Sequence, residues 1–104
     1  MANYLLVYHG GAMPETPEEN AKVMKAWTDW FGVLGDKLID GGNPVSQTRT
    51  IATDGSVSDG ASNRATGYSV IKADNLDAAL SLAKGCPVLG GGASIEVAET
   101  FNAM

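Results

Sequence analysis

The sequence is poor in the residues on which disulfides, metal sites and nucleotide loops depend. Its 104 residues include one cysteine and one histidine. The single cysteine, Cys86, excludes an intrachain disulfide and fits a reducing compartment. One histidine and one cysteine without paired ligand spacing give little support to a metal site. The glycine run at residues 90–92 lacks both the Lys-Ser/Thr pair of a phosphate loop and the GxGxxG spacing. We therefore expect no metal and no cofactor.

Long hydrophobic runs and positive charge are scarce as well. No run approaches the roughly 18 apolar residues of a membrane-spanning helix, and the apolar run at residues 4–8 is too short for a signal peptide. Seven basic residues against 12 acidic ones give a net charge of −5. The basic residues are scattered, whereas contacts to phosphates or anionic membranes need clusters. The sequence thus predicts a cytoplasmic protein that binds neither nucleic acid nor membranes.

The remaining composition is that of an ordinary globular protein. Hydrophobic residues make up 44% of the chain and charged residues 18%, which argues against wholesale disorder. A chain of 104 residues has room for one domain and not for two. We predict a single domain over residues 1–104.

The first half of the chain predicts a strand, a helix and a solvated or edge strand with a hairpin. Residues 4–8 form a continuous apolar run before two glycines, which indicates a central strand covered on both faces. Thr16 begins a capping signal for a helix over residues 17–39. Its expected apolar stripe is Met24, Trp27, Phe31, Leu34 and Leu38. Residues 45–53, with a turn at Asp54-Gly55 and a short return, predict a solvated or edge strand and its hairpin.

The second half predicts a strand, a helix and a final strand. Residues 67–73 indicate another buried strand, and Asp74 or Asn75 caps a helix whose stripe runs from residue 76 to 83. Residues 94–101 alternate around two β-branched residues and predict the last strand. The order is that of an α+β, ferredoxin-like βαββαβ fold with an antiparallel sheet and an extra hairpin. Since two helices cover only one sheet face, we expect a second sheet, and hence a homodimer, to cover the other.

A series of short motifs resembles the YCII-related family, in the branch named for an Asp-Gly-Pro-Phe motif. In order these are Asp54-Gly55, Asp59-Gly60, Gly67-Tyr68, the helix at residues 76–80, Cys86-Pro87 and Ile95-Glu96-Val97. With the opening run, the resemblance covers nearly the whole chain. It implies the dimeric ferredoxin-like α/β-barrel fold, in which two sheets face each other. It also implies a catalytic His–Asp pair, proposed for some members with the histidine on the first helix.

This chain departs from that pattern at two places. Its predicted first helix contains no histidine, and Asp59-Gly60 is followed by Ala61-Ser62 rather than Pro-Phe. His9, the only histidine, instead ends the first predicted strand, where it can act as an acid or base near neutral pH. The resemblance puts Asp59 at the signature aspartate, where it can orient His9 or bind a ligand. Alternatively, His9 ends a strand with local bonds and Asp59-Gly60 is a simple turn.

Four further residues are candidates for ligand binding. Trp30 lies off the predicted stripe and can line a pocket or an interface. Asp40 precedes two glycines and can point towards the same pocket as His9, or it closes the helix end. Arg49 and Arg64 can hold a carboxylate substrate, or they are surface residues. Cys86, at a predicted helix C-terminus, is more consistent with packing than with a nucleophile.

Two functions from different classes fit these residues. The first is a small-molecule-binding protein or weak acid/base enzyme with a cleft near the end of the first strand, where His9 is the base and Asp59 orients it. The second is a non-catalytic dimeric interaction or regulatory module. The sequence leaves open whether the protein is an enzyme, and it names no substrate.

Overall fold

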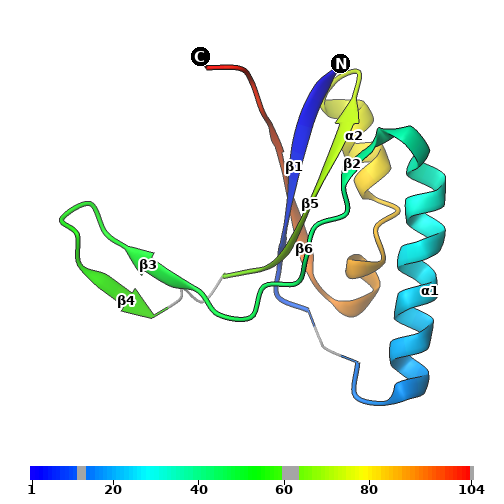
Figure 1. Cartoon of the computed structure of the whole chain (residues 1–104), viewed down its shortest axis with the longest axis horizontal. Helices are drawn as coiled ribbons and strands as arrows, with labels where there is room; N and C mark the ends of the chain where they lie inside the picture. Colours follow the sequence, from blue (N-terminus) through cyan, green and yellow to red (C-terminus); the bar gives the residue numbers. More distant parts are fainter. Residues whose placement is uncertain (12–13, 60–63, 104) are drawn as a thin grey trace.

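The protein, described by a computed structural model over residues 1–11, 14–59 and 64–103, is built of two layers, a sheet and a pair of helices (Figure 1). The elements follow one another as β1 (Ala2–His9), α1 (Pro17–Leu34), η1 (Gly35–Lys37), β2 (Leu38–Asp40), β3 (Arg49–Ile51), β4 (Val57–Asp59), β5 (Ala65–Ala73), α2 (Leu76–Ala83), η2 (Pro87–Gly91) and β6 (Ser94–Glu99). The two η segments are short 3₁₀ helices.

The main sheet has the strand order β2-β5-β1-β6, and every neighbouring pair is antiparallel. This order, with α1 after β1 and α2 after β5, is the ferredoxin-like arrangement, so the predicted fold class is confirmed. β1 lies in the middle of the sheet, as its continuous apolar run indicates. The predicted extra hairpin is also present. Its strands β3 and β4 follow β2 and precede β5 along the chain, and they form a separate two-stranded sheet.

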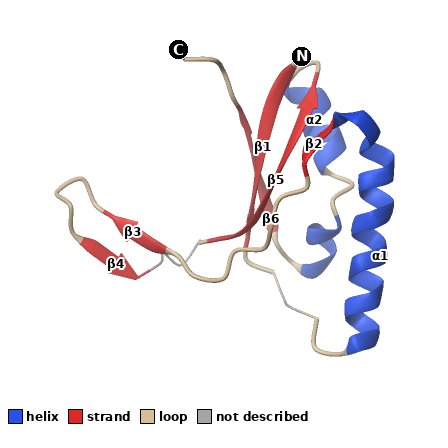
Figure 2. Ribbon diagram, viewed as in Figure 1, coloured by secondary structure: helices blue, strands red, loops and turns tan. Residues whose placement is uncertain are grey.

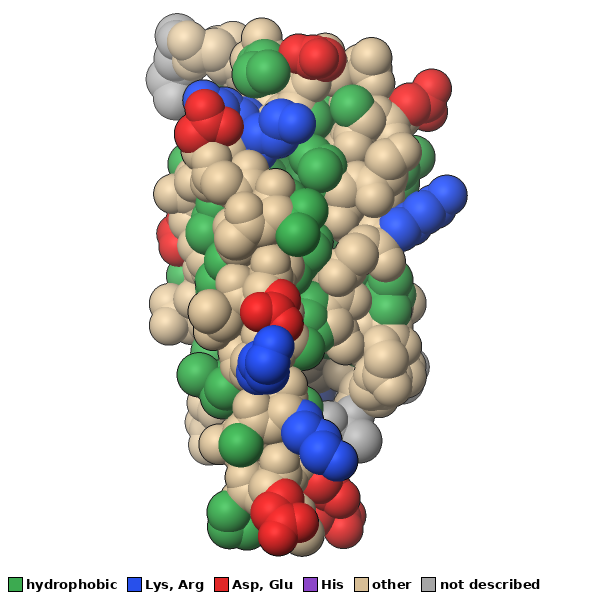
Figure 3. Space-filling view, turned by 90° about the vertical axis from the view of Figure 1, so that its right-hand side faces the viewer, with side chains coloured by type: hydrophobic (Ala, Val, Ile, Leu, Met, Phe, Trp, Pro, Cys, Tyr) green, Lys and Arg blue, Asp and Glu red, His purple; other side chains and the backbone are tan. Residues whose placement is uncertain are grey.

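The core lies between the sheet and the helices. Along β1, alternate side chains point to this side, and Tyr4 and Leu6 have no exposed surface. Ile71 of β5 is equally buried opposite Tyr4. Ala79 and Ala83 of α2 complete the contact from the helix side. Figure 3 views the molecule from its α1 side, where hydrophobic side chains lie between scattered charged ones.

The start of α1 follows the capping signal, whereas its end does not follow the sequence prediction. Thr16 Oγ1 accepts a hydrogen bond from the Glu19 backbone N–H at 3.1 Å, and the Glu19 carboxylate accepts one from the Glu15 backbone N–H. The helix ends at Leu34, because Gly35 adopts a positive φ of 57° and the chain turns. The prediction of a helix to residue 39 was therefore wrong, since residues 38–40 form the edge strand β2.

Of the solvated or edge strand predicted over residues 45–53, only residues 49–51 form a strand, and they are solvated and belong to the hairpin. Leu38 pairs with Ile71 at the sheet edge, whereas residues 49–51 belong to the separate hairpin. Between them the chain stays beside β5 through a bridge from Pro44 to Gly67. Gly42 permits this path: its φ is +77°, and a Cβ there would overlap the Tyr68 carbonyl oxygen.

The predicted apolar stripe is confirmed in the C-terminal half of α1, where Leu34 is buried and Trp27 and Phe31 pack against the core, and it is wrong at Met24. Residues 17–25 are exposed throughout, and Met24 is 59% exposed. Trp30 is instead buried, and its indole Nε1–H donates a hydrogen bond to the Leu82 carbonyl of α2 at 3.1 Å. Trp27 packs edge-on against Trp30 with 5.6 Å between ring centroids. α1 thus contacts the core through its C-terminal half.

The hairpin of residues 49–59, called the arm below, extends away from the main sheet. In Figures 1 and 2 it projects to the side of the sheet opposite α1. The molecule measures 43 × 41 × 18 Å, and its radius of gyration of 15.0 Å exceeds the roughly 13 Å expected for a compact domain of this length. The arm and the thin two-layer body account for this open shape.

Candidate functional site

The face of the sheet turned away from the helices, called the open face below, carries the candidate site. Side chains alternate along a strand, so the residues between the core positions point to this face. They are Leu5, Val7 and His9 of β1, Tyr68, Val70 and Lys72 of β5, and Glu96 and Ala98 of β6. Most are half-buried, although the described helices α1 and α2 both lie on the other side of the sheet (Figure 1). The open face is mainly apolar. Besides Tyr68, its ionisable side chains in this set are His9, Lys72 and Glu96.

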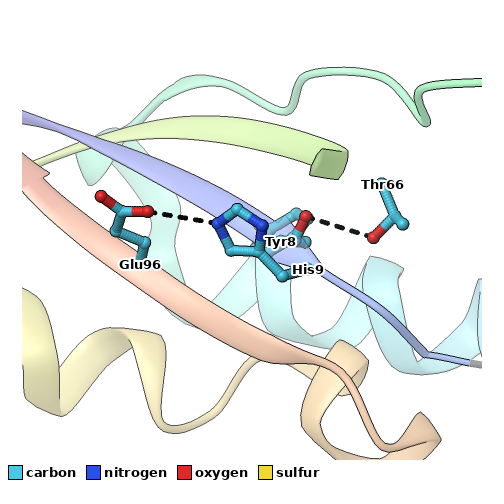
Figure 4. A network of polar contacts seen from close by, with 4 residues as sticks. All are labelled: Tyr8, His9, Thr66 and Glu96. Atoms are coloured by element: carbon cyan, nitrogen blue, oxygen red, sulfur yellow. Dashed lines mark hydrogen bonds and ion pairs between the residues drawn. The ribbon is translucent and has the colours of Figure 1, made fainter. Parts of the chain in front are cut away.

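The end of β1 is shaped by a bulge that positions His9. Tyr8 pairs with Gly67 and His9 pairs with Ala65, so Thr66 is an extra residue in β5. The Thr66 hydroxyl lies 3.2 Å from the Tyr8 carbonyl oxygen and 3.0 Å from that of Gly10, and can donate to either. Bulges commonly redirect a side chain at the edge of a site. Figure 4 shows the contact between the Thr66 hydroxyl and the backbone carbonyl of Tyr8, the residue before His9.

His9 faces a carboxylate from the neighbouring strand. Its Nε2 lies 3.2 Å from Glu96 Oε1, and the two residues come from β1 and β6 (Figure 4). The His9 side chain is 13% exposed and that of Glu96 is 68% exposed. A carboxylate accepts hydrogen bonds, so Nε2 is the donor in this contact. Glu96 therefore orients the imidazole, which is the arrangement that general acid–base catalysis uses.

Asp59, the predicted partner of His9, lies at the end of β4 in the arm. Its Oδ1 is 3.5 Å from Arg49 Nη1, and their side chains are 95% and 70% exposed. A pair this exposed contributes about 0–1 kcal/mol to stability. The structure thus joins His9 with Glu96 and Asp59 with Arg49. The catalytic pairing of His9 with Asp59 stays a prediction.

The other three candidates each have a hydrogen-bond partner elsewhere in the structure. Asp40 Oδ1 accepts a hydrogen bond from the Gly42 backbone N–H at 2.8 Å, so it closes the turn after β2 and not the end of a helix. Arg64 is exposed, and its Nη1 lies 3.4 Å from the Ser46 carbonyl oxygen. Trp30 is part of the core and is 5% exposed.

A buried polar contact lies on the core side of the same strand end. The Tyr8 hydroxyl donates to Ser69 Oγ at 2.6 Å, and Ser69 Oγ donates to the Gly41 carbonyl at 2.8 Å. Cys86 is buried beside Tyr8, and burial raises the pKa of the Cys86 thiol. Burial likewise raises the pKa of Tyr8. Both groups are thus held in their neutral forms, which does not suit Cys86 to nucleophilic attack.

An open hollow lies at the other end of β1. It measures about 630 Å³ and is lined by residues 1–3 and 99–102. The cleft that the sequence predicts near the end of β1, beside His9, stays a prediction. The described ranges contain no group of three or more His, Cys, Asp or Glu side chains able to hold a metal ion. No helix among them is both long and apolar enough to cross a bilayer.

Comparison with known proteins identifies a fold relative and no sequence relative. No family model matches the chain, and no curated protein matches it in sequence. Among solved structures, it is similar to a 5-chloro-2-hydroxyhydroquinone dehydrochlorinase from Burkholderia phenoliruptrix AC1100, solved in complex with 2,5-dihydroxybenzoquinone. The TM-score is 0.51 and the identity 16%, over 94% of this chain and 93% of the other. The likeness shows a shared fold along almost the whole chain.

Glu96 is the residue that the sequence analysis missed. It lies between Ile95 and Val97, which point to the core, so strand alternation puts Glu96 on the opposite face. That alternation is visible in the sequence, but the pairing of β6 with β1 is not. The contact with His9 depends on this pairing.

Proposed function

We propose that the protein binds a small organic molecule on the open face near the end of β1, where His9 acts as acid or base. The observation that carries the proposal is the His9–Glu96 contact on a largely apolar surface. An apolar site with a few polar groups that fix orientation is typical of small-ligand binding. A histidine oriented by a carboxylate can transfer a proton near neutral pH. In this proposal, Glu96 of the same chain holds the His9 imidazole in its orientation.

The fold relative supports the choice of ligand class. Its name refers to a hydroxylated hydroquinone, and its bound molecule is a dihydroxylated benzoquinone. A planar ring can pack on Leu5, Val7 and Tyr68, while its hydroxyl groups exchange hydrogen bonds with His9. Fold likeness alone is a weak warrant for function, so the His9–Glu96 geometry remains the main support. The order of motifs in the sequence supports placing the chain in the YCII-related family.

We further propose that the protein is a cytoplasmic homodimer whose open faces meet, with the ligand held between the two sheets at the His9 end. Leu5, Val7 and Val70 form a continuous apolar surface that no element of the described chain covers. A second sheet would remove this surface from water, which stabilises the assembly in proportion to the apolar area buried. The single buried cysteine is compatible with a reducing cytoplasm.

Two observations favour a second function, that of a non-catalytic dimeric or regulatory module. The signature motif is altered after Asp59, and Asp59 forms an ion pair with Arg49 on the arm. In this case the open face would be filled by the partner sheet and would leave no room for a ligand. A titration with a ring-shaped probe distinguishes the two functions.

The test uses 2,5-dihydroxybenzoquinone as the probe and follows its absorbance during titration. We expect the wild-type chain to bind it and His9→Ala to bind at least about tenfold more weakly, because a hydrogen bond to a charged group is lost. Glu96→Gln should weaken binding about two- to fivefold, since the pair is partly exposed. Ser94→Ala is the control. Ser94 lies opposite His9 on β6, so this variant changes a neighbouring side chain and keeps His9 and Glu96, and we expect it to bind the probe like the wild type.

Two results would count against this proposal. Unchanged affinity in His9→Ala would remove His9 from the site. A wild-type chain that does not bind the probe would favour the non-catalytic module.

A further inference from the structure

We propose that the arm grips a second copy of the chain, so that the Ile51–Val57 side of each arm packs on the other subunit when two open faces meet. This inference rests on the proposed homodimer and names the segment that holds it together. It adds a contact that lies outside the sheet face itself.

In the described part of the chain, the two strands of the arm pair with each other and with no strand of the main sheet. All six residues of β3 and β4 are exposed. Ile51 is 72% exposed and Val57 is 59% exposed. A single two-stranded hairpin is at best marginally stable in water. A partner surface is therefore needed to hold the arm in its extended form.

One side of the arm is suited to packing and the other is not. Arg49 pairs with Asp59, and Ile51 pairs with Val57. By strand alternation these four side chains lie on one side, and Thr50 and Ser58 lie on the other. The Arg49–Asp59 ion pair cancels the charges beside the two apolar residues. This side thus offers an apolar pair without net charge.

The arm and the open face border the same space. The helices lie on one side of the sheet, and the arm projects to the other, as does the chain's C-terminal segment (Figures 1 and 2). A body placed on the open face therefore meets the arm. By two-fold symmetry, its own arm meets the first copy in the same way.

The size of the open face indicates why an arm is needed. The strands β1, β2, β5 and β6 hold 8, 3, 9 and 6 residues. At about 3.4 Å per residue along a strand and about 4.8 Å between strands, the sheet face covers roughly 400 Å². A standard stable interface buries about 800 Å² per partner. The sheet alone falls short of this area. The arm and the surface that receives the partner's arm would supply most of the remainder.

The experiment is sedimentation equilibrium of the full chain and of two single variants. Ile51→Asp introduces a charge on the packing side, and we expect it to raise the dimer dissociation constant at least about tenfold. Thr50→Asp introduces the same charge on the opposite side of the same strand, and we expect less than about a threefold change. Both positions are exposed, so circular dichroism and thermal unfolding at low concentration should match those of the wild type.

Equal dissociation constants for the two variants would overturn the proposal. A wild-type chain that stays monomeric at about 100 μM would also overturn it, and would assign the arm to a different partner. The assay contains no ligand, so its outcome is independent of whether 2,5-dihydroxybenzoquinone binds.

Discussion

The two faces of the sheet are made of similar residues but lie in different surroundings. On β1, Leu6 points to the helices and has no exposed surface, whereas its neighbour Leu5 points to the open face and is only half-buried. The same contrast holds on β5 between Ile71 and Val70. The difference comes from the covering layer and not from composition. A strand that is apolar on both faces needs two covers, and the described chain supplies one.

Matched substitutions on β1 test this difference most strongly. We expect Leu6→Ala to lower the free energy of unfolding by about 2–5 kcal/mol, because it leaves a cavity in the core. Leu5→Ala should cost the monomer less than about 1.5 kcal/mol and should instead weaken the dimer. Urea unfolding at low protein concentration measures the first effect, and sedimentation measures the second. Equal losses of stability, with an unchanged dimer, would show that the two faces are equally covered within one chain.

The reactivity of the Cys86 thiol tests how well the core between the sheet and the helices excludes water. The thiol is buried and its pKa is raised chiefly by that burial, so we expect it to resist alkylation at pH 8 until the chain unfolds. Because the pKa in the folded state is the higher one, the neutral thiol contributes its full stability below the ordinary pKa of cysteine. That contribution declines as the pH rises from there through the raised value.

The measurement is the rate of iodoacetamide labelling, with and without urea, beside urea unfolding at pH 7 and pH 10. Stability should be lower at pH 10, and Cys86→Ala should show a smaller decline. Labelling of the folded protein as fast as that of an unfolded chain would contradict the account of a closed core.

Much of the fold could be predicted from local signals. Thr16 and Asn75 each accept a backbone hydrogen bond at a helix start, as their positions indicate. The central place of β1 followed from its continuous apolar run. The end of α1 could not be found by periodicity, because Leu38 lies four residues after Leu34 and faces the same core from a strand. Gly35 was the available signal for that break.

The site was less predictable than the fold, because its contacts join distant strands. His9 could be singled out as the only histidine, at the end of a strand beside glycines. Its contact with Glu96 depends on the pairing of β1 with β6, which are far apart in the sequence. Trp30 was expected to face a pocket or interface since it lies off the main stripe, yet α2 covers it. Such placements are decided by packing between elements.

The open face is the central claim, and the mass of the chain in solution tests it most directly. Sedimentation equilibrium at tens of micromolar should give twice the chain mass of 10.7 kDa, since a second sheet would cover Leu5, Val7 and Val70. A mass of 10.7 kDa throughout that range would contradict the account, because the apolar open face would then remain in contact with water.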